Sequence, residues 1–196
     1  MNVRLSLVLP LALVACGNSS PKEKGTARDC FGYTMPAGWQ EQPSKTGADL
    51  VLSGTTEFQV ADKYMRDNFI IRFLPFPGPL SAFKTIVLEQ MKSQATIDKT
   101  IEKTAGSNPA VGKLESGVPD VVSTDMKLGG REAIRLDVAN TIKIGGAPVK
   151  MKIATVFAKF GDEVVSIAMG YVDSRQAQVE PLQGPFLASV NFDRCK

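Results

Sequence analysis

The spacing of apolar residues predicts strands in the first part of the chain and then a helix. Apolar residues at every second position are typical of a half-buried strand. Strands of this kind are predicted at residues 31–35, 49–53, 57–61 and 68–74, with the second and third joined as a hairpin through residues 54–56. From Leu80 the apolar spacing changes to four, which predicts an amphipathic helix to about Ala95 and at most to Lys103.

Alternation returns in the second half of the chain. Strands are predicted at residues 121–128, 131–138, 149–157 and 165–171, separated by glycine-containing turns. A last helix is predicted at residues 175–190, although Pro181 and Pro185 weaken it. Hairpin turns without βαβ alternation predict an α+β fold with a mainly antiparallel sheet. We expect the two helices to cover one face of that sheet, wholly or in part.

The first sixteen residues contain a short apolar segment that is followed by a cysteine. Leu5–Ala15 would make a helix of roughly 16 Å, about half of a bilayer core, so it fits a signal sequence and not a permanent membrane span. Its end, Leu13-Val14-Ala15-Cys16, resembles the lipobox of bacterial lipoproteins. That resemblance implies a diacylglycerol on the thiol of Cys16, cleavage before it and often further acylation. The alternative is an ordinary signal peptide that happens to contain a cysteine.

These features divide the chain into a signal peptide (1–15), a lipidated Cys16 with a flexible polar tether (16–29), and one domain (30–196). Two or three acyl chains hold a protein stably to a membrane. Gly17, and not aspartate, follows the cysteine, which in lipoproteins of two-membrane bacteria generally implies sorting to the outer membrane. We therefore expect a lipid-anchored protein of the cell envelope that faces the periplasm.

The other two cysteines, Cys30 and Cys195, lie at the two ends of the predicted domain. Exported proteins fold in an oxidising compartment, so we expect this pair to form a disulfide that joins the ends. Two unpaired thiols are the alternative. Neither cysteine belongs to a Cys-x-x-Cys pair and the chain has no histidine, so the sequence supports neither a metal site nor a redox motif.

Positive and negative charges are nearly balanced. The chain has 23 basic and 20 acidic side chains, and one of the basic ones, Arg4, lies in the leader. Without a basic patch rich in aromatic residues, nucleic acid is not an expected partner. Nothing in the sequence predicts a cofactor.

Ser81 and Lys84 match the Ser-x-x-Lys spacing of penicillin-recognising serine enzymes, and Lys45-Thr46-Gly47 matches another of their elements. Here, however, the order of the two elements is reversed and the middle element is missing. The start of a helix followed by a solvated lysine explains the pattern better. Because the chain also lacks histidine, the usual general base, we predict that the protein is not an enzyme.

A proline-rich segment between the fourth strand and the first long helix is a possible binding patch. If exposed, Phe73, Pro75, Phe76 and Pro77 would form a rigid apolar surface for a partner, because the prolines keep the segment extended. The alternative, which we favour, is a connector that buries Phe76 in the core.

Four short motifs resemble the PsbP-like family and are spread over nearly all of residues 30–195. They are Met35-Pro36-Ala37-Gly38-Trp39, Gly129-Gly130-Arg131-Glu132-Ala133, Gly161-Asp162-Glu163-Val164-Val165 and Ser189-Val190-Asn191-Phe192. The family includes photosystem-associated lumenal proteins, a Ran-binding factor and bacterial lipoproteins of the LpqN and DcrB kinds. The resemblance implies an antiparallel sheet flanked by helices, and a protein that acts by binding other proteins. It implies no shared catalytic residues.

Three functions are compatible with these observations. We prefer a membrane-anchored lipoprotein whose domain is a non-catalytic interaction or assembly module with a protein partner. The first alternative is a carrier that binds a small molecule or lipid in a cleft between the sheet and a helix. The second is a hydrolase built on Ser81 and Lys84.

Overall fold

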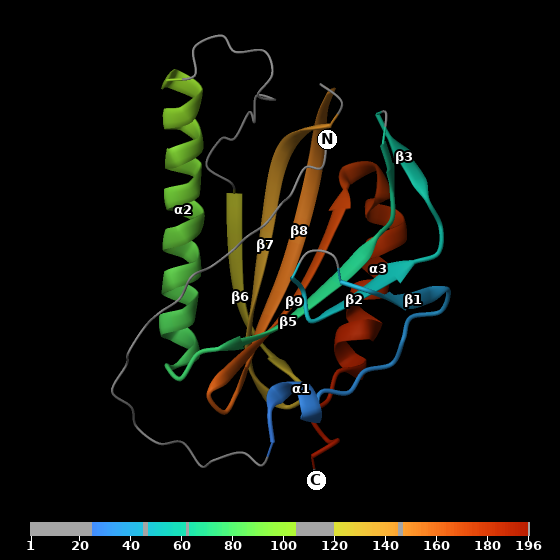
Figure 1. Cartoon of the computed structure of the whole chain (residues 1–196), viewed down its shortest axis with the longest axis vertical. Helices are drawn as coiled ribbons and strands as arrows, with labels where there is room; N and C mark the ends of the chain where they lie inside the picture. The colour runs from blue at the N-terminus through green and yellow to red at the C-terminus, as the bar shows by residue number, and fades with distance from the viewer. Residues whose placement is uncertain (1–24, 45–46, 62, 105–119, 145–146, 196) are drawn as a thin grey trace.

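Figure 1 shows the computed structural model of the chain. It describes residues 25–44, 47–61, 63–104, 120–144 and 147–195, and of residues 93–104 and 142–144 it describes the backbone only. The predicted signal peptide, Cys16, most of the predicted tether and the predicted glycine turn at residues 145–146 lie outside the described residues.

Seven strands of the described chain form one antiparallel sheet, in the order β1-β2-β5-β9-β8-β7-β6. In chain order they are β1 (Trp39–Gln42), β2 (Leu50–Gly54), β5 (Asn68–Pro75), β6 (Asp120–Leu128), β7 (Arg131–Ile144), β8 (Ala147–Phe160) and β9 (Glu163–Val172). The last four make a meander, and β5 pairs with β9 to join the two halves of the chain. The predicted α+β fold with a mainly antiparallel sheet is confirmed.

The two long helices, α2 (Leu80–Thr104) and α3 (Gln176–Ser189), pack on opposite faces of this sheet. Alternate residues of β9 show the division, since Val165 belongs to the core beneath α3 and its neighbour Val164 to the core beneath α2. The prediction that both helices cover one face is therefore wrong. The signal for two covered faces was the nearly continuous apolar sequence of β9, which is typical of a strand buried on both sides.

The first turns of α2 hold it against the sheet. Phe83 is 2% exposed, and its ring centroid lies 5.1 Å from that of Phe76 and 5.1 Å from that of Phe157 on β8. The amphipathic helix predicted from Leu80 is confirmed, and it extends to Thr104.

Two prolines lie inside α3, Pro181 and Pro185, and each removes a backbone donor from the helix interior. Tertiary packing compensates for this loss. Val179 is fully buried, and the ring of Phe186 lies 4.1 Å from that of Phe69 on β5. A 3-10 turn, η1 (Asp173–Arg175), leads into the helix.

The start of the domain differs from the prediction. A short helix, α1 (Ala27–Cys30), includes the last three residues of the predicted tether, and Thr26 and Asp29 form a capping box at its start. Residues 31–35 form no strand, because only Gly32 finds a backbone partner there, in an isolated bridge with Asn191. The first strand of the sheet, β1, begins only at Trp39.

The predicted hairpin through residues 54–56 is also wrong. The chain leaves the sheet at Gly54 and returns at Asp67, whose carbonyl accepts a hydrogen bond from the Gly54 amide. The residues between them form β3 (Phe58–Val60) and β4 (Lys63–Met65), which pair only with each other in a separate two-stranded ribbon. Arg175 holds this ribbon near η1, because its guanidinium lies 2.6 Å from Asp67 and 4.6 Å from the centroid of Phe58.

A disulfide joins Cys30 to Cys195, with Cα atoms 4.8 Å apart, as the sequence predicts. Beside it, Gly32 and Asn191 exchange two backbone hydrogen bonds of 2.8 and 2.9 Å. We call this disulfide the clasp, since it joins α1 to the segment that follows α3 at one end of the sheet (Figure 1). No helix in the described part of the chain is long and apolar enough to cross a membrane.

Replacing both Cys30 and Cys195 by alanine is expected to lower the free energy of unfolding by about 2–5 kcal/mol, because the bond closes a loop across nearly the whole domain. Urea unfolding at neutral pH measures the difference. Wild-type protein with the bond reduced is the control and should lose a similar amount. An unchanged free energy in both samples would contradict a stabilising role for the clasp.

Candidate functional site

The proline-rich segment that was considered as a binding patch is a connector that contributes to the core. Phe76 is only 6% exposed and packs edge-on against Phe83. Phe73 is partly buried in the core on the other face of the sheet. Pro75 and Pro77 are exposed, but without Phe76 they form no apolar patch. This burial corrects the hypothesis of an exposed surface and agrees with the connector alternative.

Ser81 and Lys84 do not form a reactive pair. The Lys84 ammonium lies 3.5 Å from Asp125 on β6, and Ser81 is exposed on the first turn of α2. A serine nucleophile requires a base within hydrogen-bond reach. The geometry therefore gives no support to the hydrolase hypothesis.

A row of polar side chains joins α3 to the sheet. Gln176, Glu180 and Gln183 are spaced by four and three residues, so they share one side of the helix. Each bonds to a different strand. The partners are Lys152 of β8, Tyr171 of β9 and Arg135 of β7, respectively. We call these six residues, together with Asp137, the α3 seam.

Arg135 connects three members of the seam. Its Nε and Nη2 atoms donate to Asp137 at 2.7–2.9 Å, and strand alternation places both side chains on the α3 face of β7. Nη2 also donates to Oε1 of Gln183 at 3.0 Å. The hydrogen bonds to Asp137 raise the pKa of Arg135 above its ordinary value, so the guanidinium stays charged.

Tyr171 and Glu180 form a charge-assisted hydrogen bond. The buried tyrosine hydroxyl donates to Oε1 of Glu180 at 2.8 Å. Burial, and then the bond to Glu180, raise the pKa of Tyr171. The hydrogen bonds from Tyr171 and then Gln176 lower the pKa of Glu180. At neutral pH the tyrosine is therefore protonated and the glutamate is ionised.

Lys152 completes the seam at the N-terminal end of α3. Its ammonium donates to Oε1 of Gln176 at 2.6 Å and lies 3.6 Å from Asp173. The Lys152 and Asp173 side chains are 38% and 50% exposed, so this ion pair contributes less than about 1 kcal/mol to stability.

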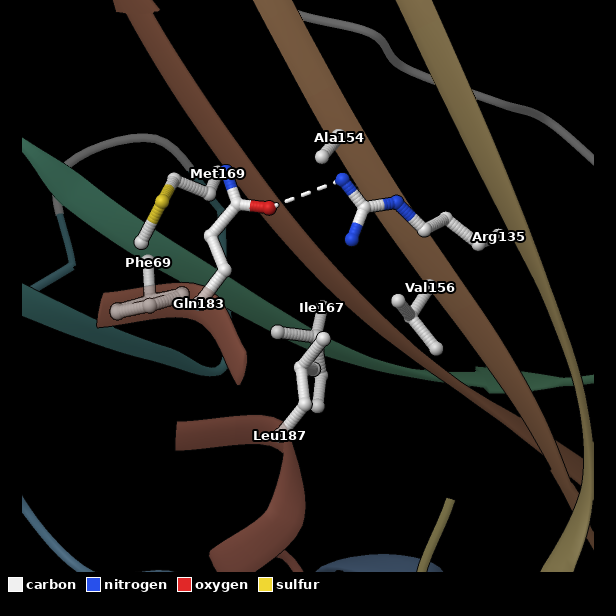
Figure 2. Close-up of a pocket in the computed structure, with 8 residues that line it drawn as sticks. All are labelled: Phe69, Arg135, Ala154, Val156, Ile167, Met169, Gln183 and Leu187. Atoms are coloured by element: carbon white, nitrogen blue, oxygen red, sulfur yellow. Dashed lines mark hydrogen bonds between the residues drawn. The ribbon is translucent and has the colours of Figure 1, made fainter. Parts of the chain in front are cut away.

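A small cavity lies beneath α3, beside the seam (Figure 2). Its polar lining is Arg135 and Gln183, and its apolar lining is Phe69, Ala154, Val156, Ile167, Met169 and Leu187. The volume is about 10 Å³, room for one water molecule, whereas sites for drug-sized ligands measure about 300–1,000 Å³. This cavity cannot hold the lipid or small molecule of the carrier hypothesis.

The seam is not arranged for acid–base catalysis. The pKa values of Arg135 and Tyr171 are raised and that of Glu180 is lowered, so each of the three pKa values is shifted further from pH 7. A general acid or base works best with a pKa near the operating pH. Within the described ranges, no group of three or more histidine, cysteine or acidic residues is placed to bind a metal ion. The contacts of the seam hold α3 on the sheet.

The sequence predicts none of the contacts between α3 and the sheet in the seam, because they depend on how the helix packs on three strands. Two local signals were present. Arg135 and Asp137 alternate with Ile134 and Leu136, which places a polar pair on one face of β7. The helical spacing from Gln176 to Gln183 was the second signal.

No protein-family model matches the sequence, and no curated protein matches it. Among solved structures, the chain is similar in fold to LpqN of Mycobacterium tuberculosis, a protein described as involved in cell envelope biogenesis. The two share 13% identity over 82% of each chain, with a TM-score of 0.50. The chain therefore has a fold similar to that of LpqN. At this identity the likeness shows the fold alone.

Two further solved structures are more distantly similar. Cyanobacterial PsbP (CyanoP) from Synechocystis shares 12% identity over 92% of this chain and 98% of its own, with a TM-score of 0.49. A protein from Bacteroides thetaiotaomicron shares 12% identity over 87% of this chain and 47% of its own, with a TM-score of 0.43.

Phe76→Ala is expected to lower the free energy of unfolding by about 3–5 kcal/mol, because it removes a ring from the core beneath α2. Tyr64→Ala is the matched control, since Tyr64 is 73% exposed and its loss should cost less than about 0.5 kcal/mol. Urea denaturation measures both. Equal, small losses would restore the exposed-patch hypothesis.

Tyr171→Phe is expected to lower the free energy of unfolding by about 1 kcal/mol at pH 7, because Glu180 loses its buried donor. A carboxylate whose pKa is lowered by folding stabilises the protein above its unfolded pKa, and this contribution is lost as the pH falls through the folded pKa. The deficit of the variant should therefore shrink below about pH 4.

Chemical denaturation across this pH range and an NMR titration of the Glu180 carboxyl measure these effects. The carboxyl pKa should rise in Tyr171→Phe. Tyr64→Phe is the control and should change neither quantity, because Tyr64 is exposed. A deficit that does not change with pH would rule out the charged carboxylate as its source.

Proposed function

We propose that the protein is a lipid-anchored envelope lipoprotein whose domain is a non-catalytic protein-interaction or assembly module. The observation that carries the proposal is Leu13-Val14-Ala15-Cys16, directly after a short apolar segment. In this proposal Cys16 carries the acyl chains. The location is the outer membrane, facing the periplasm, because Gly17 is not the aspartate that retains lipoproteins at the inner membrane.

Two structural observations support a place in the envelope. The fold is similar to that of LpqN, which is involved in cell envelope biogenesis. The clasp also fits export, since disulfides form and persist mainly outside the cytoplasm.

Other observations favour an interaction surface over catalysis or an enclosed ligand. Arg135, Tyr171 and Glu180 in the seam do not change their protonation states around neutral pH. The ammonium of Lys84 forms an ion pair with Asp125. The cavity under α3 has room for one water molecule only. A domain of this kind acts through its outer surface, where a protein partner would bind.

Expression of the full chain in a bacterium that processes lipoproteins is expected to give a membrane-bound product that begins at Cys16 and carries acyl chains. The mass of the intact protein and of its N-terminal peptide measures this. Cys16→Ser is the matched control and should lose both the acyl chains and cleavage before residue 16, while it keeps the clasp. A mature wild-type protein without lipid would refute the anchor.

The same two proteins test the interaction role. A photo-crosslinking residue can replace Tyr64 or Val122, which are 73% and 57% exposed and can change without disturbing the core. A protein captured in the native envelope by the anchored form, and not by Cys16→Ser, would support the module. A lipid or metabolite that copurifies without any protein partner would support the carrier instead.

A further inference from the structure

One buried donor of the seam has no hydrogen-bond partner among the residues that the structure describes. Gln183 is 4% exposed, and its Oε1 atom accepts the hydrogen bond from Arg135. Its Nε2 atom is buried and meets no hydrogen-bond acceptor in the described part of the chain. A buried amide group without a hydrogen-bond partner lowers the stability of a folded protein by about 1–3 kcal/mol. A buried, unpartnered Nε2 atom in Gln183 therefore requires an explanation.

Rotating the amide of Gln183 does not remove the problem. The exchange would turn the NH₂ group toward the guanidinium of Arg135, which has donors only. It would also leave Oε1 in the place that Nε2 now occupies. The orientation in which Oε1 faces Arg135 is therefore the favoured one.

Gln183 is one of the residues that line the cavity beneath α3. Figure 2 shows the unpartnered Nε2 atom on the side of Met169, away from Arg135. Met169 offers a sulfur, which is a weak acceptor, and Arg135 offers further donors at the other side of the cavity. The volume of about 10 Å³ matches a single water molecule.

We propose that this cavity is a binding site for one ordered water molecule, which accepts a hydrogen bond from Nε2 of Gln183. An ion does not suit the site, because most of the lining is apolar and the charge of Arg135 is already paired with Asp137. The bound molecule completes the hydrogen bonds of Gln183 and fixes its amide toward Arg135. It thereby helps to hold the middle of α3, between Pro181 and Pro185, against β7.

NMR measurement of water-to-protein magnetisation transfer on the full chain tests the proposal. The Gln183 side-chain amide and the methyl groups of Val156 and Met169 should show transfer from a long-lived water molecule. A crystal structure should show ordered density within about 3.2 Å of Nε2. Absence of both signals in the wild-type protein would overturn the proposal.

Gln183→Met, which fills similar space without a donor, should abolish the transfer to Val156. Gln178→Met is the matched control, since Gln178 is exposed on the same helix, and it should leave the transfer unchanged. Transfer to Val156 that survives in Gln183→Met would show that another group holds the water, which also overturns the assignment. If Gln183→Met does not fold, the wild-type measurement decides alone.

Discussion

Both faces of β8 and β9 are buried, and this constraint determines where the other elements lie. Val156 and Ile167 point to one side of the sheet, and Phe157 and Val164 to the other. Each face must be packed against apolar side chains of another element, because leaving such an apolar face exposed to water is unfavourable. α2 covers one side and α3 the other, so the domain has three layers.

The two covers are stabilised differently. α2 has an apolar stripe on a regular helix, and the aromatic contacts of Phe83 hold its first turns. α3 lacks two backbone donors because of its prolines, so side chains must secure it. Val179 and Phe186 provide the apolar contacts, and the seam provides a polar one on each of three strands. The clasp then fixes the chain that follows α3, so this helix is held along its length and beyond its end.

Features set by local sequence were predictable, and features set by distant contacts were not. The stripe of α2 and the glycine turns of the meander are local, so those elements were predicted to within a few residues, except that α2 continues past Ala95 to Thr104 and β7 is longer. α1 has a polar composition, and only the capping box of Thr26 and Asp29 distinguishes it from a tether. β4 is three residues long, too short to show a period, whereas β3 lies within the strand predicted at residues 57–61 but pairs with β4 and not with β2. The seam needs residues that meet only when the sheet and α3 are assembled.

The position of the two chain ends has a consequence for the proposed anchored form. Gly25 lies against the sulfur of Cys195, so the chain enters the domain at the clasp, beside its own C-terminal end. The tether up to Gly25 reaches at most roughly 30 Å, whereas the fourteen residues of β7 span roughly 46 Å. The clasp end would therefore stay near the bilayer.

The opposite end, with the β3–β4 ribbon and its exposed Tyr64, would extend furthest into the compartment (Figure 1). A partner that approaches from solution would meet that end first, and a partner within the membrane would meet the clasp end.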